Sequence, residues 1–323
     1  MIAGQDRAIE QFASAWASRK LHHAWLLAGP KGVGKATFAH AAARRVLAEA
    51  AGPAFDLPAI ETDDEHRIVK LVEAGSHPDM RRLERQLNEK TGNLNRNIKV
   101  EQIRELGEFM GLTAALSAWR VIVIDSVDDL EPSGANALLK ILEEPPANTL
   151  FFLVSHAPGR LLPTIRSRCR RLDFTSLDND AMTSVLEAKA PDIGAAERQR
   201  IIAMSFGSAG RALAFAELGL AKLEEAAIAI LRQGDPTNAR RADLAQELGK
   251  KGAAERYAAF LELAPSLIAR EARSLDGHRL ERALDAYARA RELAAIAPRV
   301  SLDPAATVFQ VGGILAEVAP PVP

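Results

Sequence analysis

Residues 24–40 read AWLLAGPKGVGKATFAH, and this stretch decides the fold of the first half of the chain. It opens with apolar residues that precede a Gly-Pro pair, which is typical of a short buried strand. Residues 29–35 then fit the pattern G-x-x-x-x-G-K, in which backbone N–H groups and a lysine surround phosphate oxygens. An alanine-rich run with high helix propensity follows over 36–49. The stretch therefore predicts a strand, a phosphate-binding loop and a helix.

The predicted loop lacks one ligand of a nucleotide site. The motif places Ser or Thr directly after the lysine to bind Mg²⁺, but this chain has Ala36, and Thr37 comes one residue too late. A glycine-rich turn can also be a simple strand-to-helix connection, although the strand before it and the helix after it favour a nucleotide-binding ancestry. ATP binding itself stays open at this point. The candidate nucleotide contacts in the loop are Gly29, Gly32, Gly34, Lys35, Ala36 and Thr37.

A second apolar strand is predicted over 119–125 (WRVIVID) and ends in Asp125, where nucleotide sites hold an acid for Mg²⁺. Hydrolysis usually requires a further carboxylate beside this acid to orient water, but the next residue is Ser126. Both Ala36 and Ser126 therefore weaken hydrolysis rather than the fold. We interpret the acids that follow as helix-capping residues; they are Asp128, Asp129 and Glu131.

Strands and helices alternate up to about residue 175, which predicts a parallel α/β domain. Further strands are expected at 80–85 and 150–155. From residue 176 onward the strand pattern disappears, and a composition rich in Ala, Leu, Glu and Arg predicts only helices. A Gly-Asp-Pro turn divides this helical region. We therefore expect three parts, over 1–175, 176–233 and 234–323.

The chain contains 41 Lys and Arg against 42 Asp and Glu, and this balance excludes a basic chromatin-like protein and an acidic solvating tail. Aromatic residues make up 5%, which argues against a surface that binds single-stranded nucleic acid mainly by base stacking. Any contact with nucleic acid is therefore expected to be local and directed at the backbone. The single cysteine excludes an intramolecular disulfide and a thiolate zinc site, so we expect a cytoplasmic protein. No run approaches the roughly 18 apolar residues of a membrane span, so we expect no membrane partner.

Four arginines surround the single cysteine; they are Arg166, Arg168, Arg170 and Arg171. An arginine here could contact a γ-phosphate, but spacing alone favours a solvated basic patch, with Cys169 as a small buried residue. Arg211 follows a glycine-rich segment at a predicted helix start, where it either folds over a phosphate or lies on the surface. The mixed residues His66, His77 and Asp79 are expected to be surface polar groups rather than metal ligands.

Several segments, in this order, resemble the AAA+ clamp-loader family. They are AGQ (3–5), GPKGVGKATFA (29–39), VIVIDSVDDL (121–130), ANALLKILEEPP (135–146), LVSHAPGRLLPTIRSRC (153–169) and GSAGRAL (207–213). The resemblance implies an α/β nucleotide domain over 1–175, a helical lid over 176–233 and a helical collar over 234–323. It also implies a five-subunit ring that opens a sliding clamp and places it on primed DNA for the DNA-directed DNA polymerase, with ATP at subunit interfaces. The implied partners are the ATPase subunits, the delta subunit, the clamp and primed DNA.

The same resemblance implies roles for particular residues. Arg168 is similar to the arginine finger that is offered in trans to a neighbouring ATPase, which reverses the preference for a basic patch. Arg211 matches the sensor arginine of the lid. Ser155 matches the polar residue that ends the sensor strand, and Asp125 matches the Mg²⁺ acid.

The ATPase subunits of the family carry Ser or Thr after the loop lysine and Glu after the strand acid. Ala36 and Ser126 therefore favour a stator-like subunit with little or no ATPase activity. The alternatives are an active motor subunit of the same loader, another AAA+ remodeller, and a nucleotide-binding regulator without ring partners. Bound ATP is expected to be weak or structural, with Mg²⁺ present only alongside it. Many relatives carry four zinc-binding cysteines that this chain lacks, so no zinc is expected and packing alone is predicted to stabilise the segment 50–96.

Overall fold

The structure is a computed structural model that describes residues 2–88 and 94–320, so residues 89–93 of the segment 50–96 lie outside it. The chain divides into two compact units; the first comprises Met1–Val185 and Gly207–Gly210, and the second comprises Leu186–Phe206 and Arg211–Pro323. The boundary falls within helix α7 (Asn179–Lys189). The first unit holds a parallel sheet flanked by helices and the second holds helices, which confirms the predicted fold class. The finer division at residues 175 and 233 stays a prediction.

The sheet of the first unit has five strands. Their order across the sheet is β2 (Met80–Glu84), β3 (Arg120–Asp125), β4 (Thr149–Ser155), β1 (Ala24–Ala28) and β5 (Arg170–Asp173). Because neighbouring strands are parallel, their carboxyl ends lie at one edge of the sheet, where Ala28 pairs with Ser155. The sequence predicted β1 to β4 and missed β5, which has a single buried residue, Leu172, between charged ones.

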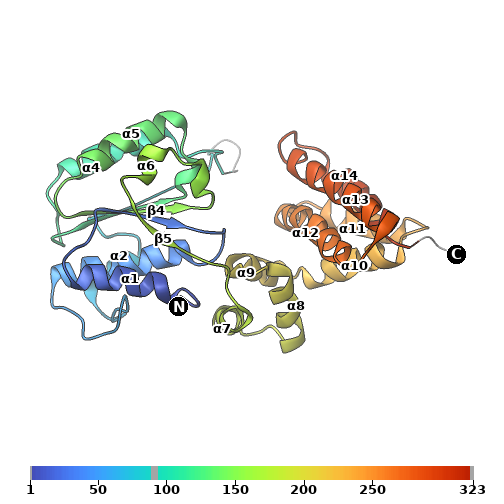
Figure 1. Cartoon of the computed structure of the whole chain (residues 1–323), viewed down its shortest axis with the longest axis horizontal. Coiled ribbons are helices and arrows are strands. Elements are labelled where there is room, and N and C mark those ends of the chain that lie inside the picture. Colours follow the sequence, from blue (N-terminus) through green and yellow to red (C-terminus); the bar gives the residue numbers. More distant parts are fainter. Residues whose placement is uncertain (1, 89–93, 321–323) are drawn as a thin grey trace. The chain divides into compact units, whose positions relative to one another are not determined.

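Helices cover both faces of the sheet, with α1 and α2 on one face and α4 and α5 on the other (Figure 1). Their bounds, with that of α3 on the first face, are α1 (Asp6–Ala17), α2 (Lys35–Ala51), α3 (Arg67–Glu73), α4 (Val100–Gly111) and α5 (Pro132–Glu143). Alternate residues of β1 enter the two cores, so that Trp25 packs on the first face and Leu26 on the second. In the first core the ring of Phe12 lies 5.3 Å from that of Trp25 and 5.7 Å from that of Phe38. This burial on both faces fixes the position of β1 and of the loop that follows it.

We predicted that packing alone stabilises the segment after α2. In the structure, arginine side chains also hold this segment. Arg45 is 7% exposed and its guanidinium donates to backbone carbonyl oxygens of the segment. These acceptors are Phe55, Leu57 and Glu61. The neighbouring Arg44 forms ion pairs with Asp64 and with Glu73 of α3. A guanidinium has five donors in a rigid plane, so one buried arginine can satisfy several carbonyl groups of an irregular segment.

Asp79 and His77 are buried, at 2% and 3% exposure, so the prediction that they are surface residues is wrong. The Asp79 carboxylate accepts hydrogen bonds from the backbone N–H groups of Ala115 at 2.6 Å, Leu116 at 2.7 Å and Ser117 at 2.9 Å. Burial by itself raises the pKa of Asp79, but these donors and His77 together bring the pKa below its ordinary value. The ionised carboxylate therefore fastens the connection between α4 and β3 to the start of β2.

The second unit is built from packed helices. They are α8 (Ala195–Ser205), most of α9 (Ala209–Glu217), α10 (Ala221–Gln233), α11 (Ala239–Leu248), α12 (Ala254–Ala272), α13 (Gly277–Ile296) and α14 (Pro304–Glu317). Helix α12 packs along α13, and α11 packs along α14. An ion pair joins α10 to α12, where Arg270 donates to the buried Glu224 at 3.0 Å. Within the described part of the chain, no helix has both the length and the apolar character needed to cross a membrane.

We predict that Asp79→Ala lowers the free energy of unfolding by about 2–3 kcal/mol, because buried N–H groups lose a charged acceptor. The pKa of Asp79 is lowered in the folded chain, so its stabilising contribution is present above the ordinary aspartate pKa and is lost as the pH falls through the folded value. Urea unfolding at neutral and acidic pH measures both effects. Asp56→Ala, at an exposed position of the same unit, is the control and should change stability by less than about 0.5 kcal/mol. An equal effect of the two substitutions would contradict the assignment.

Candidate functional site

The phosphate loop follows β1 at the edge of the sheet where the strands end, and α2 begins at its last residue, Lys35. Two of its glycines have no room for a side chain. A Cβ on Gly29 would lie 2.2 Å from the carbonyl oxygen of Phe174, and one on Gly32 would lie 2.2 Å from the Oγ of Ser208. Gly32 also has a φ of +78°, in the left-handed region that favours glycine. The tertiary packing around the loop therefore requires the glycines that the motif supplies.

Lys35 is bound to the loop itself. The side chain is 3% exposed, and its Nζ donates to the carbonyl oxygen of Gly29 at 2.6 Å and to that of Pro30. Burial lowers the pKa of Lys35 to about 8, although the carboxylates of Asp128 and Asp125 oppose this shift. The Lys35 ammonium would have to break its hydrogen bonds to these carbonyl oxygens before it could bind a phosphate group.

The first turn of α2 provides no hydroxyl at the position that the motif uses for Mg²⁺. Gly34 directly precedes the helix, with a φ of +99°. Ala36 is partly buried and carries only a methyl group, while Thr37 is exposed on the helix. Neither Ala36 nor Thr37 thus supplies the Mg²⁺ ligand that the motif places after the lysine.

Asp128 joins the ends of β3 and β4. Its carboxylate accepts hydrogen bonds from the hydroxyl of Ser155 at 2.9 Å and from the backbone N–H groups of His156 at 2.6 Å and Ala157 at 3.3 Å. The hydroxyl of Ser126 also donates to it, at 3.2 Å. The prediction that Asp128 caps a helix is therefore wrong. Its carboxylate oxygens accept hydrogen bonds from the last residue of β4 and from the two residues that follow this strand.

Two other acids at this edge are paired with arginines of the segment around β2. Asp125 lies 3.1 Å from a guanidinium nitrogen of Arg82, and Asp129 lies 3.3 Å from one of Arg85. Glu131 precedes α5, but its side chain makes no capping hydrogen bond. A carboxylate that is paired in this way must leave its arginine before it can bind Mg²⁺.

His156 borders the same cluster. Burial lowers its pKa and Lys35 lowers it further, whereas Asp128 and Asp125 raise it. The net shift is downward from an ordinary value of 6.5, so the imidazole is uncharged near neutral pH. No positive charge is thus added to this edge by His156.

A short segment from far along the sequence lies on the phosphate loop within the first unit. The backbone N–H of Gly210 donates to the carbonyl oxygen of Gly32 at 2.8 Å. The hydroxyl of Ser208 donates to the carbonyl oxygen of Lys31 at 3.0 Å. The segment that the sequence singled out at 207–211 therefore contacts the loop through backbone and serine groups.

Arg211 belongs to the second unit. Its guanidinium donates to the Oγ of Ser266 at 3.3 Å and to the carbonyl oxygen of Glu262 at 3.5 Å. The rings of Phe206 and Phe215 lie 5.8 Å and 5.1 Å from it. The sensor role implied for this arginine stays a prediction.

Arg168 follows helix α6 (Pro163–Arg166) and is one third exposed. It donates to the carbonyl oxygen of Thr164 at 2.9 Å and to the carboxylate of Glu143 at 2.6 Å. Its neighbours are also engaged, since Arg171 pairs with Asp173 at 2.6 Å. Arg166, Arg170 and Arg171 are exposed, so the finger role of Arg168 and the basic patch that spacing alone favours both stay predictions.

Cys169 lies between these arginines. It is partly buried and packs against the second core, in keeping with the packing role that we predicted. Burial raises the pKa of its thiol to about 12, so the thiol stays protonated and is a poor nucleophile.

The residues at this edge fit a phosphate group better than a metal ion. Lys35 and the amino end of α2 give the loop a positive potential. For Mg²⁺, position 36 has no hydroxyl and Asp125 is paired with Arg82. Across residues 2–88 and 94–320, no group of three or more His, Cys, Asp and Glu side chains could hold a metal ion.

A sequence model of the family described as DNA polymerase III, delta subunit, matches residues 4–178, which is more than half of the chain. The chain belongs to this family. The match spans the parallel sheet and the phosphate loop, and it includes Asp128 and Arg168.

Relatives of known name match about half of the chain or slightly more. The DNA polymerase III subunit delta' of Pseudomonas aeruginosa is 37% identical over 186 residues, which is 58% of this chain and 53% of the relative. The corresponding subunit of Escherichia coli is 34% identical over 162 residues, which is 50% of this chain and 45% of the relative. The chain thus spans about half the length of these relatives. Among solved structures, a gamma subunit-related protein of DNA polymerase III from Thermotoga maritima aligns with 96% of this chain and 99% of its own, at 16% identity and a TM-score of 0.47.

Two residues of this site were missed by sequence reasoning. Asp128 was treated as a capping acid, although its position three residues after a strand-ending aspartate is the signal that could have placed it at the sheet edge. Ser208 was quoted only as part of a glycine-rich segment. Its contact with Lys31 joins residues 177 positions apart, which no local pattern reveals.

We predict that the stability contribution of Lys35 changes with pH in a defined direction. The folded pKa is about 8 and the ordinary value is 10.5, so the unfolded chain binds more protons between them and the free energy of unfolding rises over that range. Lys35→Met removes this effect. Relative to that variant, the wild-type chain should gain about 2 kcal/mol between about pH 7 and about pH 9.5 in urea unfolding.

Lys31→Met is the control for this experiment, because it removes an exposed lysine of the same loop. It should keep the pH dependence of the wild-type chain. Identical pH dependence in the wild-type chain and in Lys35→Met would show that Lys35 is not buried as a charge.

Proposed function

We propose that this chain is the delta-prime subunit of a DNA polymerase III clamp loader, a stator-like component that helps to load the sliding clamp onto primed DNA. The proposed partners are the ATPase subunits, the delta subunit, the clamp and primed DNA, and the proposed location is the cytoplasm. The family match and the delta' relatives support this role. The observation that carries the stator part is the phosphate loop, whose lysine is bound to loop carbonyl groups and whose Mg²⁺ position holds an alanine.

The charges around the loop support low intrinsic ATPase activity. Hydrolysis requires a metal ion and a water-orienting carboxylate. The available acid, Asp125, is paired with Arg82, and the position of the second carboxylate holds Ser126. Any ATP bound here is proposed to be weak or structural, with Mg²⁺ only alongside it and no zinc. An active motor subunit remains the second candidate, since relatives of this chain include a DNA polymerase III subunit tau from Bacillus subtilis at 30% identity.

Arg168 is proposed as the arginine finger that this chain offers in trans. Its guanidinium is partly exposed and is bound to a surface carboxylate, Glu143, and to one carbonyl oxygen. An exposed ion pair of this kind contributes only about 0–1 kcal/mol, so a phosphate of higher charge can replace the carboxylate. The nucleotide roles of Ser155 and Arg211 are proposed on the same resemblance.

We predict that the isolated chain binds ATP weakly, that Mg²⁺ does not strengthen this binding, and that no turnover occurs. Ala36→Ser restores the hydroxyl of the motif and should make binding depend on Mg²⁺. Calorimetric titration with ATP, with and without Mg²⁺, measures both. Ala54→Ser is the matched control, because it adds the same hydroxyl at an exposed position outside the phosphate loop and should have no effect. Micromolar binding with steady turnover by the wild-type chain would contradict the stator role.

We predict that Arg168→Ala lowers ATP turnover of the reconstituted clamp loader in the presence of clamp and primed DNA. At the site that the finger completes, the expected loss is about 10³–10⁵-fold. Arg171→Ala is the matched control, since it removes a neighbouring arginine that pairs with Asp173. Equal turnover in Arg168→Ala and wild-type complexes would leave Arg168 as a surface arginine.

A further inference from the structure

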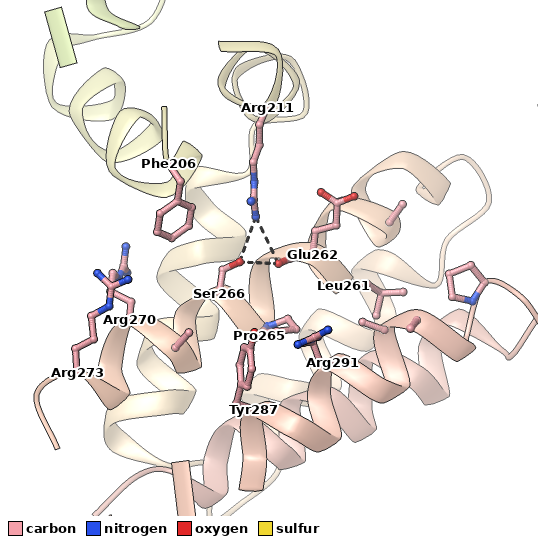
Figure 2. A pocket seen from close by; sticks show the side chains of 15 residues that line it. Phe206, Arg211, Leu261, Glu262, Pro265, Ser266, Arg270, Arg273, Tyr287 and Arg291 are labelled. Atoms are coloured by element: carbon pink, nitrogen blue, oxygen red, sulfur yellow. Dashed lines mark hydrogen bonds between the residues drawn. The ribbon is translucent and has the colours of Figure 1, made fainter. Parts of the chain in front are cut away.

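The second unit contains a hollow of about 570 Å³ whose walls carry an excess of positive charge. Figure 2 shows Arg211 pointing at Ser266 and Glu262 of α12, with Phe206 to its left. Tyr287 and Arg291 of α13 lie below Ser266 in this view. The charged lining residues of the described chain are Arg211, Glu262, Arg270, Arg273 and Arg291, which is four guanidinium groups against one carboxylate. Like charges brought together in this way repel one another, and an anionic ligand would relieve that repulsion.

The arginines of the hollow differ in what they contact. Arg270 is paired with the buried Glu224 at 3.0 Å, and Arg211 is bound to α12 as described above. Arg273, at the end of α12, and Arg291, on α13, have no ion-pair partner among the residues that the structure describes. The guanidinium of Arg291 lies 5.9 Å from the ring of Tyr287, one turn away on the same helix. Two guanidinium groups from different helices are thus available to an anion in the same hollow.

Phe206 adds a second observation at the rim. It is 50% exposed and lines the hollow. Its backbone has a φ of +49° and a ψ of 42°, in the left-handed region that a bulky residue rarely adopts. This left-handed residue ends α8, and the ring of Phe206 lines the hollow beside Arg211, whose guanidinium lies 5.8 Å from it.

We propose that this hollow binds single-stranded nucleic acid, with Arg273 and Arg291 on backbone phosphates and Phe206 and Tyr287 stacked on bases. Guanidinium groups bind phosphate through paired donors, and exposed rings stack on any base. An acidic peptide would use the arginines but would leave the exposed Phe206 without a role, so nucleic acid is favoured. The proposal depends on the proposed function in one respect, which is that this function brings the chain to primed DNA. The arginines make the local, backbone-directed contacts that the composition allows, and the low aromatic content limits stacking here to these two rings.

The test uses the full isolated chain and a fluorescein-labelled oligothymidylate of about 15 nucleotides, a length within the usual site sizes. Fluorescence anisotropy is measured over a series of salt concentrations. The double variant Arg273→Glu/Arg291→Glu should weaken binding about tenfold or more and reduce the slope of log affinity against log salt by about 1.4. The matched control is Arg279→Glu/Arg282→Glu, which makes the same charge change on exposed residues of α13 that do not line the hollow. It should keep most of the wild-type affinity.

A second arm tests stacking. Phe206→Ala should weaken oligothymidylate binding by about five- to hundredfold and should leave binding of an abasic phosphodiester of the same length unchanged. If the two charge variants weaken binding equally, or if a polyglutamate peptide binds as tightly as the oligonucleotide and is insensitive to Phe206→Ala, the proposal is overturned. The milder pair Arg273→Gln/Arg291→Gln replaces the charge reversal if circular dichroism shows loss of helix.

This test separates the inference from the proposed function. Clamp loading by a reconstituted complex that contains Arg273→Glu/Arg291→Glu reports on the role of the subunit. Wild-type loading together with unchanged oligonucleotide affinity would overturn the hollow as a nucleic-acid site and leave the proposed function standing. If the wild-type chain fails to join or support a loader but its oligonucleotide binding is still weakened by the variant, the proposed function is overturned and the nucleic-acid site stands.

Discussion

The parallel pairing of β1 with β4 is the constraint on which the candidate site depends. It places Ala28 opposite Ser155, so the phosphate loop and the end of β4 start from the same edge. The N–H of Gly29 then donates to the carbonyl oxygen of Ser155 at 3.3 Å. The hydroxyl of Ser155 in turn donates to Asp128, which follows β3. Three strand ends are therefore tied together by groups that no single strand could position.

Within this edge the charged groups are satisfied by the chain itself. The ammonium of Lys35 is bound to carbonyl oxygens of its own loop, and Asp125 is paired with Arg82. Buried charges are costly unless they are paired or hydrogen-bonded, so the loop carbonyl oxygens offset part of the cost of burying the Lys35 ammonium, whose pKa is still lowered. Such a loop is consistent with the stator-like role that we propose.

Buried charges also hold the irregular parts of the first unit. Arg45 satisfies several carbonyl groups of the segment after α2, and Asp79 satisfies three N–H groups before β3. Each is a single side chain that replaces many backbone partners, which regular strands and helices would otherwise supply. The hollow of the second unit is the exception, because Arg273 and Arg291 have no such partner in the described chain.

The sequence by itself determined the local order of the chain. The stretch 24–40 specified a strand, a glycine loop and a helix, since apolar runs, glycines and alanines act on neighbours a few residues away. The same stretch identified Lys35 and the alanine that replaces a Mg²⁺ ligand. Only the tertiary structure decided that Lys35 binds its own loop, that Asp128 joins two strands and that Ser208 lies on the loop. These contacts join groups far apart in the sequence, and they exist only after the parallel sheet has brought its strand ends to one edge.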